Sequence, residues 1–569
     1  MASTPIAHVQ GSDDGSPMAG ETVTVEGIMT LDTRGNGGFQ GFYLQQADHR
    51  ADDNPRTSEA LFVYTQKTGG KPGHRLRLTG RVKEYHGLTE LVRITALRDC
   101  GSAPIPAAIE VQLPWSGGVH PEHLENMHIA INQPLTVIDH YNLGRYGELT
   151  LAPNFQFTAT QTIAPGPDAV QLTRTQQAAR LILDDGRGQR NPEPVPYPTP
   201  ALTLDHTVRA GDRIPELRGV LDYRFGNWRL QPLFTPEFRI GNPRPEPPRR
   251  PERSSLRIAT LNLGNYFNGD GDGEGFPTAR GAGSQAALER QTARLVATLT
   301  GLDADIITVM EIENDGTGPE SAVARLAATM GEQWRFSVSG QHQQDVIRSA
   351  FLFDSEKVQV SGAPKTIATG PFHNAGRVPL VQTFRVRQHD RRVRLVASHF
   401  KSKSCRGAKG LNQDQNDGQG CFGATRTRAA EAMIDWLAAT QPEASRQADA
   451  DSDGFSGTLT GTLMGTLITG DLNSYAMEPP LMRFRTAGFV DLVRHFQGLD
   501  SYSYRYRGGA GTLDYILADA ALKPYVISAA SWAVNADEPP ALGYRDQSTP
   551  VSVPWRSSDH DPIVVDLAL

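Results

Sequence analysis

Polar and apolar residues alternate along short stretches in the first part of the chain. Residues 21–29 and 75–82 both follow a period of two, the pattern of a strand with one buried and one solvated face. Turn-forming residues separate such stretches at short intervals. Short strands at this spacing predict a small β-barrel of the OB type over residues 1–112.

A second copy of this pattern occurs further along the chain. Residues 72–87 and 210–226 both run from a glycine-initiated strand to a hairpin with an aromatic residue. This internal repeat predicts a second β-barrel module over residues 113–243. Two roles remain open for the hairpin aromatics: stacking platforms for single-stranded nucleic acid, or core residues that close the barrel. They are Tyr85, Tyr223, Phe225 and Trp228.

The pattern changes after a proline-rich segment. Residues 244–254 form a stiff, extended linker, and short apolar runs then alternate with helical periodicity. Apolar residues at helical spacing predict amphipathic helices at 285–300 and 424–439. Strands separated by helices form an α/β core with functional residues at one edge of the sheets. We therefore expect a catalytic domain over residues 255–569.

Residues that can carry chemistry lie at five places in this last domain, four where a short apolar run ends and one just before the last apolar run begins. These residues are Asn262, Glu311, His399, the pair Asp471 and Asn473, and the pair Asp559 and His560. Taken singly, each has an ordinary explanation as a turn former, a solvated carboxylate or a structural histidine. Five such places in one domain favour a shared site.

The residue types fit hydrolysis of a phosphodiester, which needs charge neutralisation and an activated water. Glu311, Asp559 and the neutral Asn262 carry the hard oxygen ligands that Mg²⁺ or Mn²⁺ prefers. Asp471 can align or deprotonate the water. Asn473 can donate a hydrogen bond to a non-bridging phosphate oxygen.

Two histidines can carry the proton transfer. His399 and His560 can act as a proton-transfer pair or bind the phosphate, and each needs a carboxylate that fixes its tautomer. Asp514 is the expected partner of one of them. Asp345 is a weaker candidate for the other.

The order of these motifs resembles the endonuclease/exonuclease/phosphatase superfamily, which includes pancreatic-type DNases and abasic-site nucleases. The segments that carry the resemblance are 260–262, 310–311, 398–399, 470–473, 513–514 and 558–560. Longer segments are similar to the secreted bacterial nucleases of the ExeM/NucH type; they are residues 141–149, 399–403, 417–421 and 532–539. Met310 stands where the superfamily usually has glutamine.

The resemblance implies a four-layered, DNase-like α/β sandwich, dependence on Mg²⁺ or Mn²⁺, and secretion. We therefore expect an extracellular deoxyribonuclease, acting on DNA or also on RNA with little sequence preference, that clears or scavenges extracellular DNA. A monomer without a membrane partner is expected. The alternative within the superfamily is a phosphomonoesterase or a phospholipid head-group phosphodiesterase. The β-modules suit an extended polymer and favour the nuclease.

Basic residues near the motifs support a polyanionic substrate. Lys401 and Lys403 follow His399 directly, and Arg428 and Arg377 are further candidates for binding phosphate. Each of them alone is equally explained as a solvated surface charge.

Two of the three cysteines flank a short polar loop. Cys405 and Cys421 could be bridged, a link that stabilises a loop of this size by about 3 kcal/mol. Such a bridge would pin the basic loop beside the site, and a secreted protein would allow it. Cys100 is left as a half-buried free thiol.

Two acidic loops place carboxylates at alternate positions before a glycine, as calcium-binding loops do. The carboxylates are Asp270 and Asp272 in the first loop and Asp449, Asp451 and Asp453 in the second. Neither loop has an acidic residue eleven positions after its first aspartate. Structural Ca²⁺ and a flexible acidic loop therefore both remain open.

The bulk composition adds limits to these expectations. The chain has 569 residues, of which 38% are hydrophobic, enough for several cores. Its net charge of −7 means that nucleic-acid contacts must come from local basic patches. No apolar run reaches the length of a membrane span. The sequence starts without an apolar signal region, so a cytosolic protein and a mature secreted form both remain open.

Overall fold

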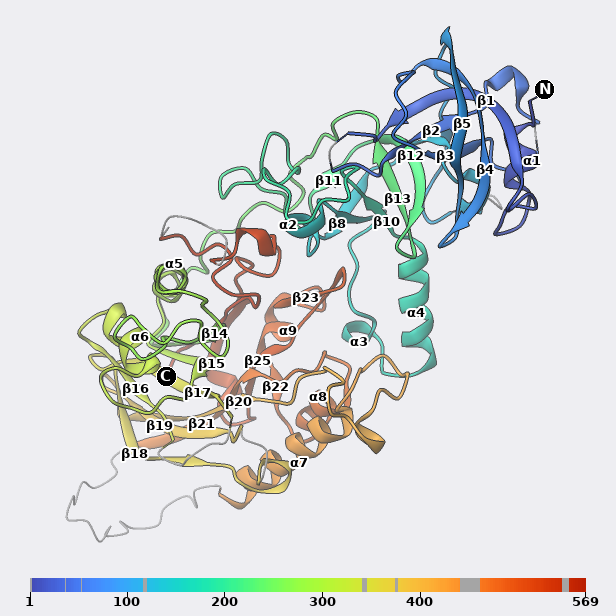
Figure 1. Ribbon diagram of the computed structural model, residues 1–569. Helices are drawn as coiled ribbons and strands as arrows, with labels where there is room; N and C mark the ends of the chain where they lie inside the picture. Colours follow the sequence, from blue (N-terminus) through green and yellow to red (C-terminus); the bar gives the residue numbers. More distant parts are fainter. Residues whose placement is uncertain are drawn as a thin grey trace. The chain divides into compact units, whose positions relative to one another are not determined.

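The structure is a computed structural model that describes most of the chain. The described residues are 3–35, 37–52, 54–115, 120–339, 345–373, 377–440, 461–544 and 552–569. They divide into two compact units (Figure 1). The first unit consists of Met1–Gln156, Arg174–Pro243 and Pro539–Ala541, and the second of Phe157–Thr173, Arg244–Glu538 and Leu542–Leu569. The sites predicted for hydrolysis all lie in the second unit.

A closed five-stranded barrel follows the short helix α1 (Ile6–Gln10) in the first unit. Its strands, in pairing order, are β1 (Thr22–Asp32), β2 (Gly41–Gln45), β3 (Ala60–Tyr64), β5 (Leu88–Ser102) and β4 (His74–Tyr85). β3 and β5 pair in parallel. Leu76, Leu78 and Val82 of β4 point into the barrel core, as the alternating pattern requires. The prediction of a small barrel is confirmed here.

The rest of the first unit forms an eight-stranded sheet rather than a second barrel. Its order is β11 (Arg213–Ile214), β8 (Leu135–Asp139), β9 (Leu149–Ala152), β10 (Leu181–Leu183), β13 (Asn227–Pro232), β12 (Leu217–Arg224), β7 (His128–Ile131) and β6 (Ile109–Glu110). The repeat does produce matching hairpin turns, since His86-Gly87 and Phe225-Gly226 all have positive φ. The turn is a local feature, whereas the partners of the flanking strands are set by distant residues.

The hairpin aromatics divide between the surface and a half-buried pair. Tyr85 and Phe225 are 46% and 77% exposed, so neither closes a core. Tyr223 and Trp228 face each other across the β12–β13 hairpin with ring centroids 4.8 Å apart. Tyr85 and Phe225, at the hairpin ends, are therefore not core residues.

Two six-stranded sheets form the centre of the second unit. The first has the order β16 (Trp334–Ser337), β17 (Ile347–Asp354), β15 (Ile306–Glu313), β14 (Leu256–Tyr266), β27 (Ile563–Leu567) and β26 (Val526–Ser531). The second has the order β18 (Val358–Thr366), β19 (Leu380–Val386), β20 (Arg391–His399), β21 (Thr462–Asp471), β25 (Asp514–Ala518) and β22 (Val490–Asp491). The sheets share one apolar core, in which Phe351 of the first packs against Phe384 of the second.

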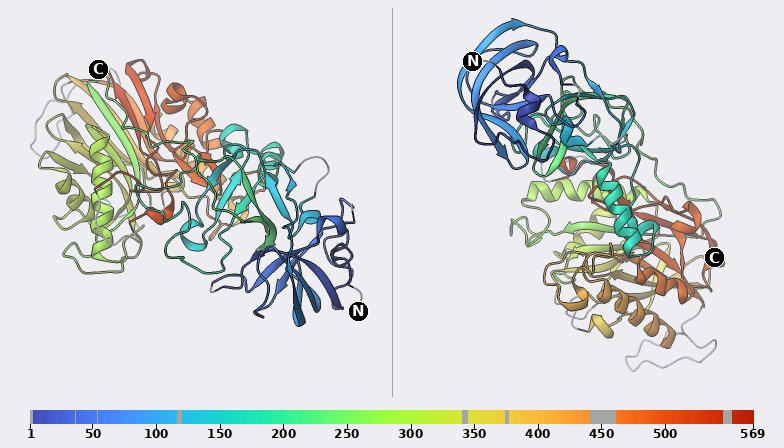
Figure 2. Two further views of the ribbon diagram at one scale, coloured as in Figure 1. Left: turned by 90° about the horizontal axis from the view of Figure 1, so that it is seen from above. Right: turned by 90° about the vertical axis from the view of Figure 1, so that its right-hand side faces the viewer.

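Helices cover the outer faces of both sheets (Figure 2). α5 (Gln285–Gly301) and α6 (Ala322–Met330) pack on the first sheet, where Leu295 and Leu299 join its core. α7 (Gly423–Ala439) and α8 (Pro479–Thr486) pack on the second, with Met433 and Leu437 inward. The second unit is therefore a mixed α/β sandwich of four layers. The two helices predicted from periodicity coincide with α5 and α7.

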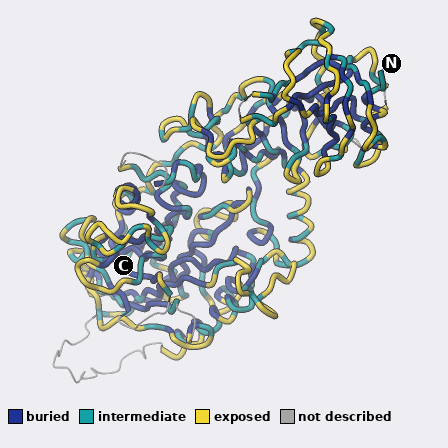
Figure 3. The backbone as a smooth tube through the Cα atoms, viewed as in Figure 1, coloured by how far each residue is buried: buried dark blue, intermediate teal, exposed yellow. Residues whose placement is uncertain are grey.

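Shorter elements complete the described chain. They are α2 (Leu143–Tyr146), α3 (Ala159–Thr162), α4 (Pro167–Ala178), α9 (Leu492–Gln497) and the paired strands β23 (Tyr504–Tyr506) and β24 (Gly509–Gly511), with short 3-10 turns. Figure 3 shows that the strands of the central sheets are largely buried, whereas α4 is largely exposed. Among the described residues, no helix has both the length and the apolar character that crossing a membrane requires.

Candidate active site

Strand register places three of the predicted residues in one row. β20 and β21 pair in parallel with His399 opposite Asp471, and β21 and β25 pair antiparallel with Asp471 opposite Asp514. In the other sheet, Asn262 of β14 lies opposite Met310, the residue before Glu311. Neighbouring strand ends in each sheet therefore present these side chains at the same edge.

Two of the site residues have strained backbones. Glu311 and Asn473 have φ values of 58° and 48°, in the left-handed region that costs a non-glycine residue of order 1 kcal/mol or more. Glu311 also sits where the pairing of β15 with both neighbours shifts register. Such irregularities re-aim side chains and gather at functional sites.

Asp514 holds His560 by a short hydrogen bond. Nδ1 of His560 donates to Oδ2 of Asp514 at 2.7 Å, and the hydroxyl of Ser503 donates to the same oxygen at 2.8 Å. Burial lowers the pKa of His560, but the charge and hydrogen bond of Asp514 outweigh it and raise that pKa well above its ordinary value. His560 is therefore the charged imidazole of the site. The ring of Tyr504 lies against it, with centroids 4.5 Å apart.

The turn that carries His560 is braced from two sides. Nδ2 of Asn535 donates to the carbonyl of His560 at 2.7 Å, while Oδ1 of Asn535 accepts from the backbone of Ser557 at 2.9 Å. The hydroxyl of Ser558 donates to the carbonyl of Asn262 at 2.6 Å, which joins the turn to β14. Asn535 was not singled out from the sequence, although it lies in the segment 532–539 that carried the resemblance.

The second imidazole, that of His399, is held in its neutral form. Nη1 of Arg377 donates to Nε2 of His399 at 3.0 Å, and Nε of Arg377 donates to Asp345 at 2.8 Å. Burial, and then the positive charges of Arg377 and His560, lower the pKa of His399 well below its ordinary value. Asp345 thus orients Arg377 rather than a histidine, and Arg377 contacts His399.

Asp471 lies close to His399, and the charge of His560 also acts on it. Its Oδ2 is 3.5 Å from Nε2 of His399. Burial, with the charges of Asp514 and Glu311, raises the pKa of Asp471 to about 7 against the opposing charge of His560. Asn473 holds this carboxylate through its backbone N–H at 2.8 Å and its Nδ2 at 3.0 Å.

The three predicted metal ligands are two carboxylates and one amide. The amide nitrogen of Asn262 donates to Oδ2 of Asp471 at 3.3 Å, and its Oδ1 accepts from the backbone of Gly264 at 3.1 Å. Burial, and then the negative charge of Asp559, raise the pKa of Glu311 above its ordinary value, while a hydrogen bond from Asn262 lowers it. Two carboxylates whose repulsion raises a pKa in this way fit a divalent cation by charge and by donor chemistry. In the part of the chain that the structure describes, however, no three His, Cys, Asp or Glu side chains converge closely enough to hold a metal.

The predicted phosphate-binding lysines have partners in the protein. Nζ of Lys403 donates to the buried Glu478 at 2.5 and 2.6 Å, and burial lowers the pKa of Lys403 to about 8 despite this partner. Nζ of Lys401 lies over the ring of Phe422, 4.9 Å from its centroid.

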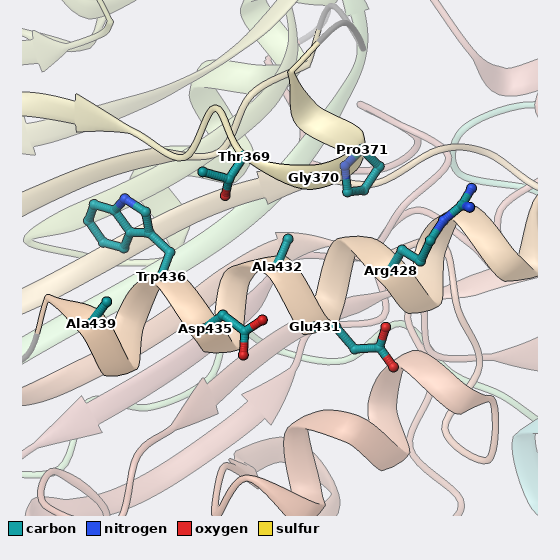
Figure 4. A pocket seen from close by; sticks show the side chains of 9 residues that line it. All are labelled: Thr369, Gly370, Pro371, Arg428, Glu431, Ala432, Asp435, Trp436 and Ala439. Carbon is teal, nitrogen blue, oxygen red and sulfur yellow. The ribbon is translucent and has the colours of Figure 1, made fainter.

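Arg428 lines a separate surface pocket. This pocket, of about 740 Å³, lies between the turn at Gly370 and α7, which contributes Arg428, Asp435 and Trp436 (Figure 4). Arg428 therefore lies apart from the row formed by His399 and the residues paired with it.

The basic loop is closed by a disulfide between Cys405 and Cys421, and Cys100 is a free, half-buried cysteine. In the first acidic loop, Oδ1 of Asp270 accepts backbone hydrogen bonds from Asp272 and Glu274 at 2.9 and 3.0 Å. The loop thus folds around its own carboxylate, and calcium binding there stays a prediction. The second acidic loop, with Asp449, Asp451 and Asp453, lies outside the described residues.

One family model matches part of the chain, and no curated protein matches it. The model describes a domain of unknown function (DUF8508) and matches residues 120–239, within the predicted second module.

The solved structures that are similar to this chain include members of the endonuclease/exonuclease/phosphatase superfamily. A protein of that name from Bacteroides vulgatus has 14% identity and a TM-score of 0.34, over 55% of this chain and 98% of its own. An AP endonuclease from Archaeoglobus fulgidus has 15% identity and a TM-score of 0.32, over 55% and 100%. TDP2 from D. rerio, complexed with a single-strand DNA product, has 14% identity and a TM-score of 0.32, over 55% and 97%. Such values do not by themselves assign a function.

Proposed function

We propose that this chain is a secreted, divalent-metal-dependent phosphodiesterase that hydrolyses DNA with little sequence preference. The observation that carries the proposal is the row of His399, Asp471 and Asp514 across three strands. This row brings a neutral imidazole, a carboxylate that titrates near neutrality and the carboxylate that charges a second imidazole into one site. Hydrolysis at neutral pH needs a base and an acid whose pKa values are held apart in this way.

The charge states define the work of each group. His560, held protonated by Asp514, donates to a phosphate oxygen or to the leaving group. Asp471, with its pKa of about 7, accepts a proton from the attacking water. Burial and the positive charge of Arg377 keep His399 neutral, and His399 orients the water or the phosphate. Asn473 donates two hydrogen bonds to Asp471 and so holds the base in position; it acts on the base rather than on the substrate.

Glu311, Asn262 and Asp559 are the residues that would hold Mg²⁺ or Mn²⁺. The ion, when bound, supplies Lewis-acid charge stabilisation at the phosphate. Burial first, and then the negative charge of Asp559, raise the pKa of Glu311, and a bound cation would oppose the second of these causes.

Two features support the setting and the substrate. The Cys405–Cys421 disulfide fits an oxidising compartment, which favours secretion. The barrel has the order β1-β2-β3-β5-β4, and we assign it to the OB type, whose members bind single strands along the barrel face. The exposed Tyr85, with Nζ of Lys83 4.1 Å from its ring centroid, then provides a stacking surface.

A substrate panel tests the proposal. Plasmid, linear duplex, single-stranded DNA, RNA and a phospholipid head-group ester are incubated with the wild type and with His560→Ala, each with and without EDTA. We expect EDTA-sensitive DNA cleavage that His560→Ala abolishes while its circular dichroism spectrum stays unchanged. Cleavage of the head-group ester without cleavage of DNA would make the phospholipid head group, rather than DNA, the proposed substrate. Equal activity in His560→Ala would overturn the mechanism.

A further inference from the structure

A short segment from the earlier part of the chain packs among the loops of the candidate active site. Phe157–Thr173 lies in sequence between two parts of the first unit, yet it belongs to the second. It contains α3 and the first half of α4 (Figure 1). We call Phe157–Thr173 the inserted arm.

Gln161 of the inserted arm joins three loops of the second unit. Its Oε1 accepts backbone hydrogen bonds from Thr512 at 3.0 Å and from Ala476 at 3.3 Å. Its Nε2 donates to the hydroxyl of Thr512 at 3.3 Å and to the carbonyl of Ser501 at 3.4 Å. Gln161 is 4% exposed, so these contacts are shielded from water.

Each of these loops leads within a few residues to the proposed acid–base machinery. Thr512 is two residues before Asp514, and Ser501 is two residues before Ser503, whose hydroxyl donates to Asp514. Ala476 is three residues after Asn473, which holds Asp471. One amide side chain therefore sets the spacing between the strand end that carries the base and the one that orients the acid.

The neighbours of Gln161 fix the inserted arm in place. The hydroxyl of Thr160 donates to Glu478 at 2.8 Å, and Thr160 accepts from the backbone of Met477 at 3.0 Å. The backbone of Thr158 donates to Ala510 at 2.8 Å. A Cβ on Gly509 would lie 2.7 Å from the hydroxyl of Thr158, so β24 needs glycine there to admit the arm.

We propose that the inserted arm is a working part of the active site and that Gln161 is a positioning residue for the Asp514–His560 pair. This inference rests on the proposed phosphodiesterase function. It assigns a catalytic purpose to a segment outside residues 255–569. The catalytic domain predicted from the sequence is therefore incomplete without a contribution from the preceding module.

The first test replaces Gln161 by methionine in the full chain. Gln161→Met keeps the length of the side chain and removes its four hydrogen bonds. We expect kcat for duplex DNA to fall about 10- to 100-fold, because small misplacements of catalytic groups cost this much, with KM changed less than about 3-fold. The matched control is Gln382→Met. Gln382 is also buried and hydrogen-bonded, to Ser337 and Gly362, and kcat is expected to stay within about 2-fold. An unchanged kcat in Gln161→Met would overturn the inference.

The second test asks whether Gln161 acts through Asp514. In the Asp514→Asn background, Gln161→Met is expected to lower kcat by less than about 3-fold, because the pair that it positions is already lost. The same fold loss in both backgrounds would indicate a merely structural role and overturn the inference. If Gln161→Met does not fold by circular dichroism, Thr512→Val, which removes one hydrogen bond to Gln161, enters the same cycle and is judged by the same criterion. A folded wild type that cleaves no phosphodiester would instead overturn the proposed function.

Discussion

Asp514 accepts a hydrogen bond of 2.7 Å from Nδ1 of His560, although the two residues belong to different sheets. Asp514 begins β25 of one sheet, and His560 lies in the turn before β27 of the other. Nδ1 is engaged in this bond, so a substrate contact of the ring has to be made through Nε2, and Asp514 raises the pKa of the ring and helps to keep it charged. The packing of the two sheets therefore determines both the orientation and the charge of this imidazole.

Replacing Asp514 by asparagine should remove that charge. The pKa of His560 then falls, because burial still lowers it and the largest of the charges that raise it is gone. We expect kcat/KM at neutral pH to drop about 10²- to 10⁴-fold and to recover in part as the pH is lowered and His560 is protonated again. Steady-state cleavage of a labelled duplex between pH 5 and 9 measures this.

Asp519→Asn is the matched control for this change. Asp519 follows the same strand and accepts backbone hydrogen bonds from Thr466 and Leu522 at 2.7 and 2.8 Å. Its variant should keep the wild-type pH profile. A profile for Asp514→Asn that keeps the wild-type shape would contradict a charged His560.

Arg377→Gln should steepen the acid limb of the pH profile. The positive charge of Arg377 is, after burial, the largest cause that lowers the pKa of His399. Its removal raises that pKa, so His399 becomes protonated at a higher pH than in the wild type. In the wild type the protonation of Asp471, with its pKa of about 7, sets the acid limb, so we expect kcat/KM to fall more steeply below pH 7 in Arg377→Gln, where His399 is protonated as well.

Arg385→Gln provides the control for Arg377. Arg385 is a half-exposed arginine of β19 that pairs with Asp390 at 3.3 Å. Both variants lose one positive charge, and only the first loses it beside His399. If Arg377→Gln and the wild type have the same acid limb, catalysis does not require His399 to be neutral.

The strand ends of the site could be predicted from the sequence because each borders an apolar run of strand length. Glu311, His399 and Asp471 follow such a run, and Asp559 and His560 precede one. Parallel pairing then brings such ends to one edge, as it does for His399 and Asp471. Gln161 could not be found in this way, because its contacts join residues more than 300 positions apart. Tyr504 lies on a two-stranded ribbon whose position near His560 depends on packing alone.

The prediction of a second barrel shows a related limit. Residues 72–87 and 210–226 do share a hairpin with the same turn geometry. A hairpin satisfies only the hydrogen bonds between its own two strands, so its outer edges remain free to pair with any strand that the fold delivers. Strand β4 pairs outward with β1 and closes a barrel, whereas β12 pairs outward with β7 in an open order of eight strands.

Metal binding should be detectable without any assay of cleavage. If Glu311 and Asp559 share a cation, Mg²⁺ or Mn²⁺ stabilises the folded protein by about 2.7 kcal/mol at a concentration 100 times its Kd. We expect a rise in the melting temperature of the wild type that Glu311→Gln reduces and that EDTA reverses. Glu332→Gln, at a carboxylate beyond α6, should keep the full rise. Equal rises in Glu311→Gln and wild type would place the cation elsewhere.

A buried ion pair joins β14 and β27, the first and last strands of the second unit, which pair side by side within one sheet. Nε and Nη2 of Arg257 donate to Asp566 at 2.8 and 3.0 Å, and both side chains are 1% exposed. Burial raises the pKa of Asp566, but hydrogen bonds from Arg257, Ser528 and Ser254 lower it below its ordinary value. Asp566→Asn leaves Arg257 buried without its counter-charge and should cost about 3–5 kcal/mol at neutral pH.

The pH dependence of this loss follows from the direction of the pKa shift. Because the folded pKa of Asp566 lies below the unfolded value of about 3.9, the stabilisation is fully present above that value and is lost as the pH falls through the folded pKa. Urea unfolding followed by tryptophan fluorescence should therefore show that the free energy of unfolding differs strongly between wild type and Asp566→Asn at pH 7 and less near pH 3. The control variant Asp435→Asn changes an exposed carboxylate and should have the free energy of unfolding of the wild type at both pH values. A difference for Asp566→Asn that stays constant across this range would mean that its stabilising effect does not depend on the charge.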